Sequence, residues 1–178
     1  MALDADNVVV GVTGGVFFAP LATVLPVDAS TALAVGYLEV GYLEESGVAE
    51  DQPTSNTKIK AWQNAAIVRV VQTEHSATLK FTMQESNPNT LELFYGNYTA
   101  GAVDIDGAAL PHHVIVIDVI DGANVVRMVA EDAQITERGT VSYVNAGVAS
   151  YPVTIECFPG ADGVKIHKYY DTAGVPAA

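Results

Sequence analysis

Strand signals dominate the chain from residue 59 onward, chiefly as alternation between apolar and polar positions. Residues 78–84 (TLKFTMQ) alternate without interruption, which is the pattern of a strand with one buried face. Residues 66–73 (AIVRVVQT) precede this segment. The short link at 74–76 predicts that the two strands form a hairpin.

An almost wholly apolar run at 113–120 (HVIVIDVI) is typical of a central strand that is covered on both faces. The sequence DGAN at 121–124 predicts a tight turn into a further strand at 125–130. More strands are predicted at hairpin spacing, with PGADG joining the last two: 140–146, 151–158 and 164–170. The alternation of the second of these places Cys157 on its apolar face, which indicates a core residue and not a nucleophile.

One helix is predicted at about 87–96 (NPNTLELFYG). Asn87 can cap it, Pro88 suits the first helical position, and Gly96 can adopt the left-handed conformation that ends a helix. Apolar residues at i, i+3 and i+4 from Leu91 form a stripe that a sheet could bury. One short helix beside many antiparallel strands predicts a mainly β fold, either a β-sandwich or a partly closed barrel with a flanking helix.

A pentad is written twice near the N-terminal third of the chain, as GYLEV at 36–40 and GYLEE at 41–45. A period of five matches neither a helix nor a strand, so neither element would keep both copies on one face. The repeat therefore predicts two short extended pieces joined at Gly41, with a turn at Ser46-Gly47. Such a segment is typical of an edge strand and its loop.

The 178 residues are most simply one domain at 1–178. We expect a flexible N-terminal arm at 1–15, because GVTGGV at 11–16 lacks the Lys-Ser/Thr of a phosphate-binding loop, and a C-terminal tail at 171–178. Prolines interrupt the longest apolar stretch, at 16–27, so it does not predict a membrane span. The N-terminus lacks a basic region, so we expect no export as a secretory protein.

Charged residues make up only 16% of the chain while apolar residues reach 49%. A surface with so little charge favours burial against other copies, so we expect an obligate oligomer. The net charge is −13, and residues 1–57 hold no Lys or Arg. Half of the eight basic residues lie between 58 and 80: Lys58, Lys60, Arg69 and Lys80. A head-to-tail assembly could pair the acidic segment of one copy with this basic cluster on the next, although both could equally be solvated surface.

Chemical motifs are absent from the sequence, and so we expect neither an enzyme nor a bound cofactor or metal. His112 and His113 are neighbours on a predicted strand and would point to opposite faces. The segment that starts at Asp104 resembles a calcium loop, but Ile115 stands where the bidentate Glu is required. Paired acids such as Glu44-Glu45 are typical of solvated charge. The acid excess also argues against a protein that grips nucleic acid.

The order of these parts resembles the major tail tube proteins of long-tailed bacteriophages. The likeness is carried by the N-terminal arm, GYLEESGVAED at 41–51, AW at 61–62, the strand hairpin and the helix NPNTLELFYG. The closing segments VVRMVAEDAQITERGTVSYV and YPVTIECFPG continue it. Ser46 departs from the family, which often has Asp after this Glu.

The resemblance implies six-subunit rings of a two-sheet sandwich, stacked into a hollow tube through which double-stranded DNA passes. It also implies a place in the virion tail, assembly in the bacterial host cytoplasm, and partners such as a tape measure protein and tail terminator or tip proteins. We expect subunit contacts at the residues Tyr37, Leu38, Tyr42, Leu43, Glu44, Glu45, Lys58 and Lys60. We also expect a net negative channel that lets DNA slide.

Two other classes of protein stay open at this point. A ligand-binding or lyase-type β-barrel would use His112, His113 or Glu156 inside a cavity and would be a discrete monomer or dimer. Another virion structural protein, such as a head decoration protein, would share the composition but bind a capsid.

Overall fold

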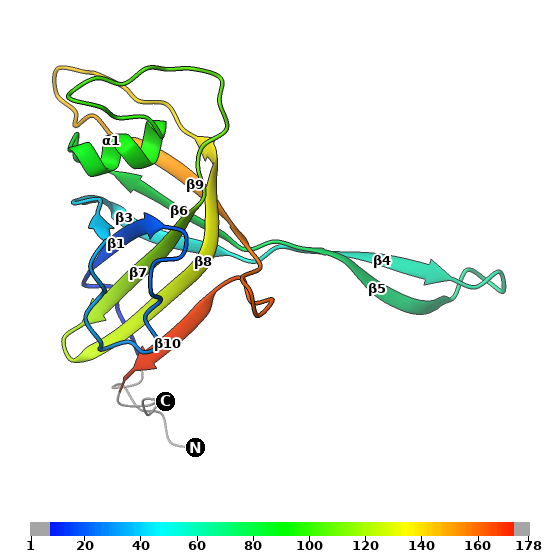
Figure 1. Ribbon diagram of the computed structural model, residues 1–178. Helices are drawn as coiled ribbons and strands as arrows, with labels where there is room; N and C mark the ends of the chain where they lie inside the picture. The colour runs from blue at the N-terminus through cyan, green and yellow to red at the C-terminus, as the bar shows by residue number, and fades with distance from the viewer. Residues whose placement is uncertain (1–7, 173–178) are drawn as a thin grey trace.

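The computed structural model describes residues 8–172 (Figure 1). Its elements in chain order are β1 (Thr13–Pro20), β2 (Leu38–Glu39), β3 (Leu43–Asp51), β4 (Thr54–Lys60), β5 (Ile67–His75), β6 (Thr78–Met83), α1 (Pro88–Tyr95), β7 (His113–Asp121), β8 (Asn124–Arg138), β9 (Tyr151–Phe158) and β10 (His167–Asp171). Of the ends expected to be flexible, at 1–15 and 171–178, residues 1–7 and 173–178 lie outside the described residues.

One antiparallel sheet forms the body, with the strand order β2-β1-β7-β8-β9-β6-β3 and with β10 beside β8. The long strand β8 pairs with β10 through its first half and with β9 through its second half, and its register shifts between Ile135 and Glu137. The two outermost strands, β2 and β3, are separated by only three residues, 40–42. The sheet must therefore curl until its two edges approach each other, although it does not close.

Apolar side chains cover both faces of β7, as the sequence predicted for a central strand. Val114, Ile115, Val116 and Ile117 are all buried. The even-numbered pair packs with β1 and the loop at 21–36, whereas the odd-numbered pair faces the main core inside the curled sheet. The turn at 121–124 joins β7 to β8 as predicted.

The helix α1 covers one end of the main core, and its predicted boundaries are confirmed. The Asn87 side chain accepts a hydrogen bond from Thr90 N, and Gly96 is left-handed with φ 80°. Leu93 and Phe94 are buried, and the ring of Phe94 makes an edge contact with Tyr151. The helix thus joins the core through its apolar stripe.

The repeated pentad is explained by the two edges of the sheet. The first copy supplies β2 at one edge and the second copy begins β3 at the other edge. Gly41 lies between them with φ 86°, and a side chain there would collide with Glu85. Glycine is therefore required at position 41 for two reasons: the left-handed backbone conformation, and the lack of space for a side chain.

Side chains around the start of α1 hold this link in place. The carbonyl of Val40 accepts hydrogen bonds from Asn87 Nδ2 at 3.1 Å and from Thr90 Oγ1 at 2.7 Å. Tyr42 N donates to Glu85 Oε1 at 2.8 Å. The hydrogen bond to Glu85 is the main cause of the lowered pKa of its carboxyl. The approach of the two sheet edges is thus fixed by a network of polar contacts.

Several local predictions are wrong. β5 pairs with β4 and not with β6, so the predicted hairpin of 66–73 with 78–84 does not form. Residues 140–146 form no strand, and β10 pairs with β8 instead of β9. The predicted turn at Ser46-Gly47 is a register shift inside β3, where Gly47 is left-handed.

Two of the glycines that were expected in a flexible N-terminal arm, Gly14 and Gly15, belong to a strand instead. β1 begins at Thr13, and a side chain on Gly14 would lie 2.1 Å from the carbonyl oxygen of Asp118 on β7. Gly14 therefore permits close approach between strands. The general prediction is confirmed, because the fold is mainly β and antiparallel with a single short helix in the described chain.

Candidate assembly surfaces

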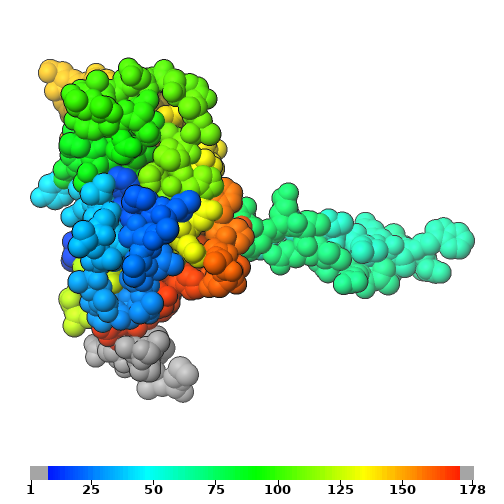
Figure 2. All heavy atoms as spheres, in the orientation of Figure 1, coloured from blue at the N-terminus to red at the C-terminus, as the bar shows by residue number. Residues whose placement is uncertain are grey.

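A two-stranded hairpin, residues 54–75, projects from the body and is here called the arm (Figure 2). Every residue of β4 is exposed, as is every residue of β5 except Val71. Among the strands of residues 8–172, β4 and β5 pair only with each other. An isolated hairpin is marginally stable in water at best, so a partner surface would add to its order.

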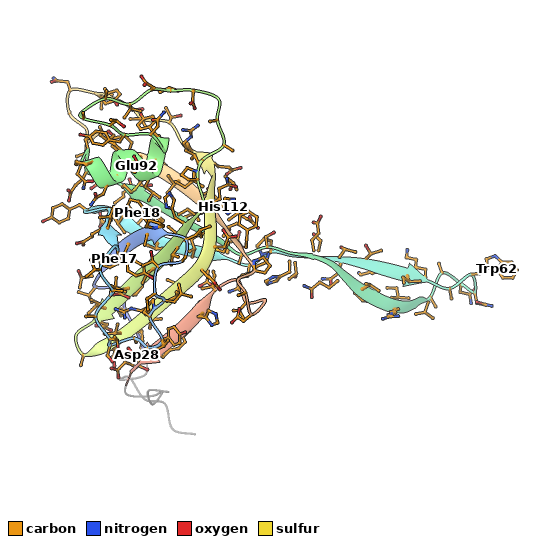
Figure 3. The ribbon with its side chains drawn as sticks, in the orientation of Figure 1. Phe17, Phe18, Asp28, Trp62, Glu92 and His112 are labelled. Atoms are coloured by element: carbon orange, nitrogen blue, oxygen red, sulfur yellow. The ribbon has the colours of Figure 1, made fainter. Side chains whose placement is uncertain are left out.

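The arm carries apolar side chains that nothing in the described chain covers. Trp62 stands at its tip with 96% of its surface exposed (Figure 3). Four aliphatic side chains behind it are also largely exposed: Ile59, Ile67, Val68 and Val70. Exposed tryptophan and aliphatic groups on one projecting element are typical of a protein-binding surface.

The arm is also basic, whereas the rest of the chain is acidic. Lys58, Lys60 and Arg69 lie on it, and there is no Asp or Glu between residues 53 and 73. No ion pair joins these three cations to a described acidic side chain. The fourth residue of the predicted basic cluster, Lys80, is on β6 and forms an ion pair with Asp51 at 3.9 Å. The cluster read from the sequence is therefore divided between the arm and the body.

A groove of about 870 Å³ lies between the approaching edges of β1 and β3 and is here called the acidic groove. Its lining includes residues 11–15 of β1 and its approach, and residues 41–43 and 45–48 around the start of β3. Four acidic side chains contribute to it: Glu39, Glu45, Glu85 and Asp118. β2 pairs with Phe17 and Phe18 alone, so within residues 8–172 the edge of β1 along 13–15 is unpaired. Unpaired strand edges are able to accept an added strand.

Behind the groove, Arg127 neutralises Asp118. Arg127 is 5% exposed, and its guanidinium donates to both carboxylate oxygens, at 2.7 and 2.8 Å. It also donates to the carbonyls of Asp28, at 3.2 Å, and Thr31, at 2.6 Å, in the loop at 21–36. The hydrogen bonds to Asp118 are the main cause of the raised pKa of Arg127. The remaining net charge of the groove comes from its three other carboxylates.

The predicted contact residues divide between the surface and the subunit's own packing. Tyr42 is 78% exposed at the acidic groove and Leu38 is 42% exposed on β2. Tyr37 and Leu43 instead pack partly against the cores, and Tyr37 donates to the carbonyl of Val24 at 3.1 Å.

The four charged candidates are all exposed, with Glu44 and Glu45 beside the groove and Lys58 and Lys60 on the arm. Sequence reasoning missed Trp62, Arg69 and the aliphatic groups of the arm as a single surface. The sequence did contain a signal for this surface. Residues 53–73 include basic residues but no acidic ones, and apolar residues accompany the basic ones.

The side chains considered for catalysis do not converge. His112 contacts Asp132 with Nδ1 2.5 Å from Oδ1, and His113 packs against Phe18. Glu156 lies on β9. Among residues 8–172, no three His, Cys, Asp or Glu side chains stand close enough to hold a metal ion.

Two buried groups have shifted pKa values with structural causes. Cys157 is fully buried on β9, and burial raises the pKa of its thiol to about 12, so it is a core residue as predicted. Both ring nitrogens of His113 are buried and have no hydrogen-bond partner in the described part of the chain. Burial is the main cause of the lowered pKa of His113. The nearby backbone of Ala19 acts in the opposite direction and has a smaller effect.

Comparison with protein families gives a match over nearly the whole chain. The sequence profile of a family described as phage tail tube protein matches residues 1–177. No curated protein sequence matches. Within the described residues, no helix has the length and apolar character needed to cross a membrane.

Two solved structures show limited similarity to the fold. The tube-terminating cap of the anti-feeding prophage is 12% identical with a TM-score of 0.49, over 97% of this chain and 100% of that one. A chain of the anti-feeding prophage baseplate is 12% identical with a TM-score of 0.43, over 94% of this chain and 97% of that one.

Proposed function

The chain belongs to the phage tail tube protein family, and from this membership we propose that copies of it form six-subunit rings that stack into a hollow tail tube. Membership makes the chain a structural part of the virion and not an enzyme. It also sets aside the earlier alternatives of a ligand-binding or lyase-type barrel and of a head decoration protein.

The observation that carries self-association is the arm. It extends away from its own subunit with Trp62 at the tip and with exposed aliphatic side chains along both strands. Burial of a tryptophan and several aliphatic groups contributes strongly to protein association. A second copy of this chain is the partner that a self-assembling family would supply.

The charge of the subunit supports passage of DNA without binding. The net charge of −13 is repeated by any ring symmetry. Lys and Arg that neutralise phosphates strengthen attachment to DNA, whereas an acidic channel repels the duplex at close approach, within about 8–10 Å at physiological salt. We therefore propose that the channel of the tube is net negative and keeps the DNA free to slide.

Other parts of the tail follow from a tube of this kind. A tube requires other proteins to set its length and to close its ends. We propose that these are a tape measure protein inside the tube and terminator and tip proteins at its two ends. Assembly would take place in the bacterial host cytoplasm.

Electron microscopy of the purified protein tests the proposal. The wild-type protein is expected to form rings or tubes with a central hole as its concentration rises. The matched variant replaces residues 54–75 by Asn-Gly. Ser76 N already donates to the carbonyl of Pro53 at 3.1 Å, so the chain ends that this turn must join are adjacent. This variant should fold and stay monomeric.

The wild-type protein staying monomeric at high concentration would contradict the proposed function, and tubes formed by the armless variant would contradict the role of the arm. The channel is tested separately, by the charges that line it in a tube structure and by DNA binding. A net basic lining, or tight low-salt binding of duplex DNA by intact tubes, would overturn the negative channel even if the tubes are present.

A further inference from the structure

We propose that the acidic groove of one copy receives the tip of the arm from the next copy. The inference rests on the proposed self-association and names the surface that the arm binds. Trp62 would enter the groove, while Lys58 and Lys60 would reach the carboxylates at its rim.

The charges of the two surfaces match. The groove holds Glu39, Glu45 and Glu85 without a basic partner among the described residues, and its fourth acid, Asp118, is already neutralised by Arg127. The arm carries three cations and no acid between residues 53 and 73. Opposite charges on two facing surfaces steer association and fix its register.

The groove is also suited to the apolar tip. Its volume of about 870 Å³ is large enough for the indole of Trp62 and its neighbours, but not for the whole arm. Val12, Val48 and Val119 are in its lining, and Tyr42 is exposed beside them. The unpaired edge of β1 at 13–15 offers backbone groups to the entering chain.

The placement of the two surfaces produces a chain of contacts. β3 runs from the groove at Leu43 to the base of the arm at Asp51, and its nine residues span about 30 Å. Figure 1 shows the arm on the opposite side of the body from the start of β3. Surfaces that face away from each other give head-to-tail contacts, which continue from copy to copy.

A second hollow on the body is a poorer receptor for the arm. It has a volume of about 660 Å³ and is lined by β3, β6, β8 and β9. Lys80 and Arg138 contribute to its lining beside a single acid, Glu137. A basic arm would meet like charge there, which disfavours this site.

Charge exchange between the two surfaces tests the inference. The groove variant Glu39→Lys/Glu45→Lys and the arm variant Lys58→Glu/Lys60→Glu change only exposed side chains. Each alone should assemble only at a concentration about tenfold or more above that of the wild type. An equal mixture of the two should assemble again, because the altered arm of one variant meets the altered groove of the other.

A matched control places the same change of charge elsewhere. Asp104→Lys/Asp106→Lys alters two exposed acids that are not in the groove and should assemble like the wild type. Trp62 is the only tryptophan in the chain, so its fluorescence reports on the arm tip. Its emission should shift to shorter wavelength when the wild type assembles.

The outcomes distinguish the inference from the function on which it rests. If the groove variant forms tubes as readily as the wild type while the arm variant does not, the arm binds another surface and the inference is wrong. If the mixture fails to restore assembly, the two surfaces do not meet. If wild-type protein forms no tubes at all, the proposed function itself fails.

Discussion

Replacing Arg127 by methionine is expected to destabilise the folded subunit by about 3–5 kcal/mol at neutral pH. The guanidinium is buried and makes the four hydrogen bonds described above, two of them to the carboxylate of Asp118. The side chain of Asp118 is itself only 13% exposed. Methionine fills similar space but leaves a buried negative charge and two carbonyls without their partner.

Protonation of the unpaired Asp118 carboxylate sets an upper bound on the part of this loss that comes from the buried charge. Neutralising an aspartate with an ordinary pKa near 3.9 costs about 4 kcal/mol at pH 7 and about 1.5 kcal/mol at pH 5. The variant should therefore be destabilised less at pH 5 than at pH 7, by at most about 2.7 kcal/mol, which is the limit for the uptake of one proton over two pH units. At about 2–4 °C per kcal/mol for a chain of this size, the neutral-pH loss lowers Tm by roughly 6–20 °C.

Urea unfolding followed by far-ultraviolet circular dichroism gives the required free energies, at a protein concentration below that of assembly. Fluorescence is a poorer probe here, because Trp62 is exposed on the arm. The double variant Arg127→Met/Asp118→Leu should recover much of the lost stability, since no charge then remains buried. A loss under about 1 kcal/mol, or an equal loss at both pH values, would refute this account of the pair.

Three further predictions concern single side chains. Burial lowers the pKa of His113, so the folded state binds fewer protons than the unfolded state. The contribution of His113 to the free energy of unfolding should be fully present above pH 6.5, the usual histidine pKa. It should fall as the pH drops toward the lowered pKa. His113→Leu should reduce this acid loss in pH-dependent urea titrations, and an unchanged pH profile would count against it. Cys157, with a pKa of about 12, should resist alkylation in the native protein at pH 8 and react once urea unfolds it; rapid native labelling would show that the site opens. Thr90→Val removes the hydrogen bond to the carbonyl of Val40 and should cost about 1–3 kcal/mol in urea unfolding, because that buried carbonyl loses one of its two partners; no measurable change would mean that Asn87 suffices.

Local signals in the sequence were enough to predict the elements whose structure depends on residues nearby in the chain. The cap at Asn87 and the stop at Gly96 define α1 through contacts within ten residues. The apolar run of β7 required burial on both faces wherever the strand was placed. The turn at 121–124 needed only its own residues to join β7 to β8.

Strand pairing could not be read in the same way, because it depends on partners far along the chain. β4 lacks apolar alternation, so nothing in its own residues marked it as the partner of β5. Gly14, Glu45 and Glu85 all line the groove, and no local pattern in the sequence connects them. The charges of both surfaces were visible in the sequence, but their separation into an arm and a groove was not.

The way in which the arm joins the body determines how the subunit bears mechanical load. β4 follows directly from β3, and β5 leads directly into β6. β3 and β6 pair with each other, and β6 pairs along its length with β9. Tension applied along the arm therefore shears these strands against their neighbours. Many backbone hydrogen bonds share the load and must break together. A subunit built in this way resists pulling through its arm far better than peeling from the free edge of β3.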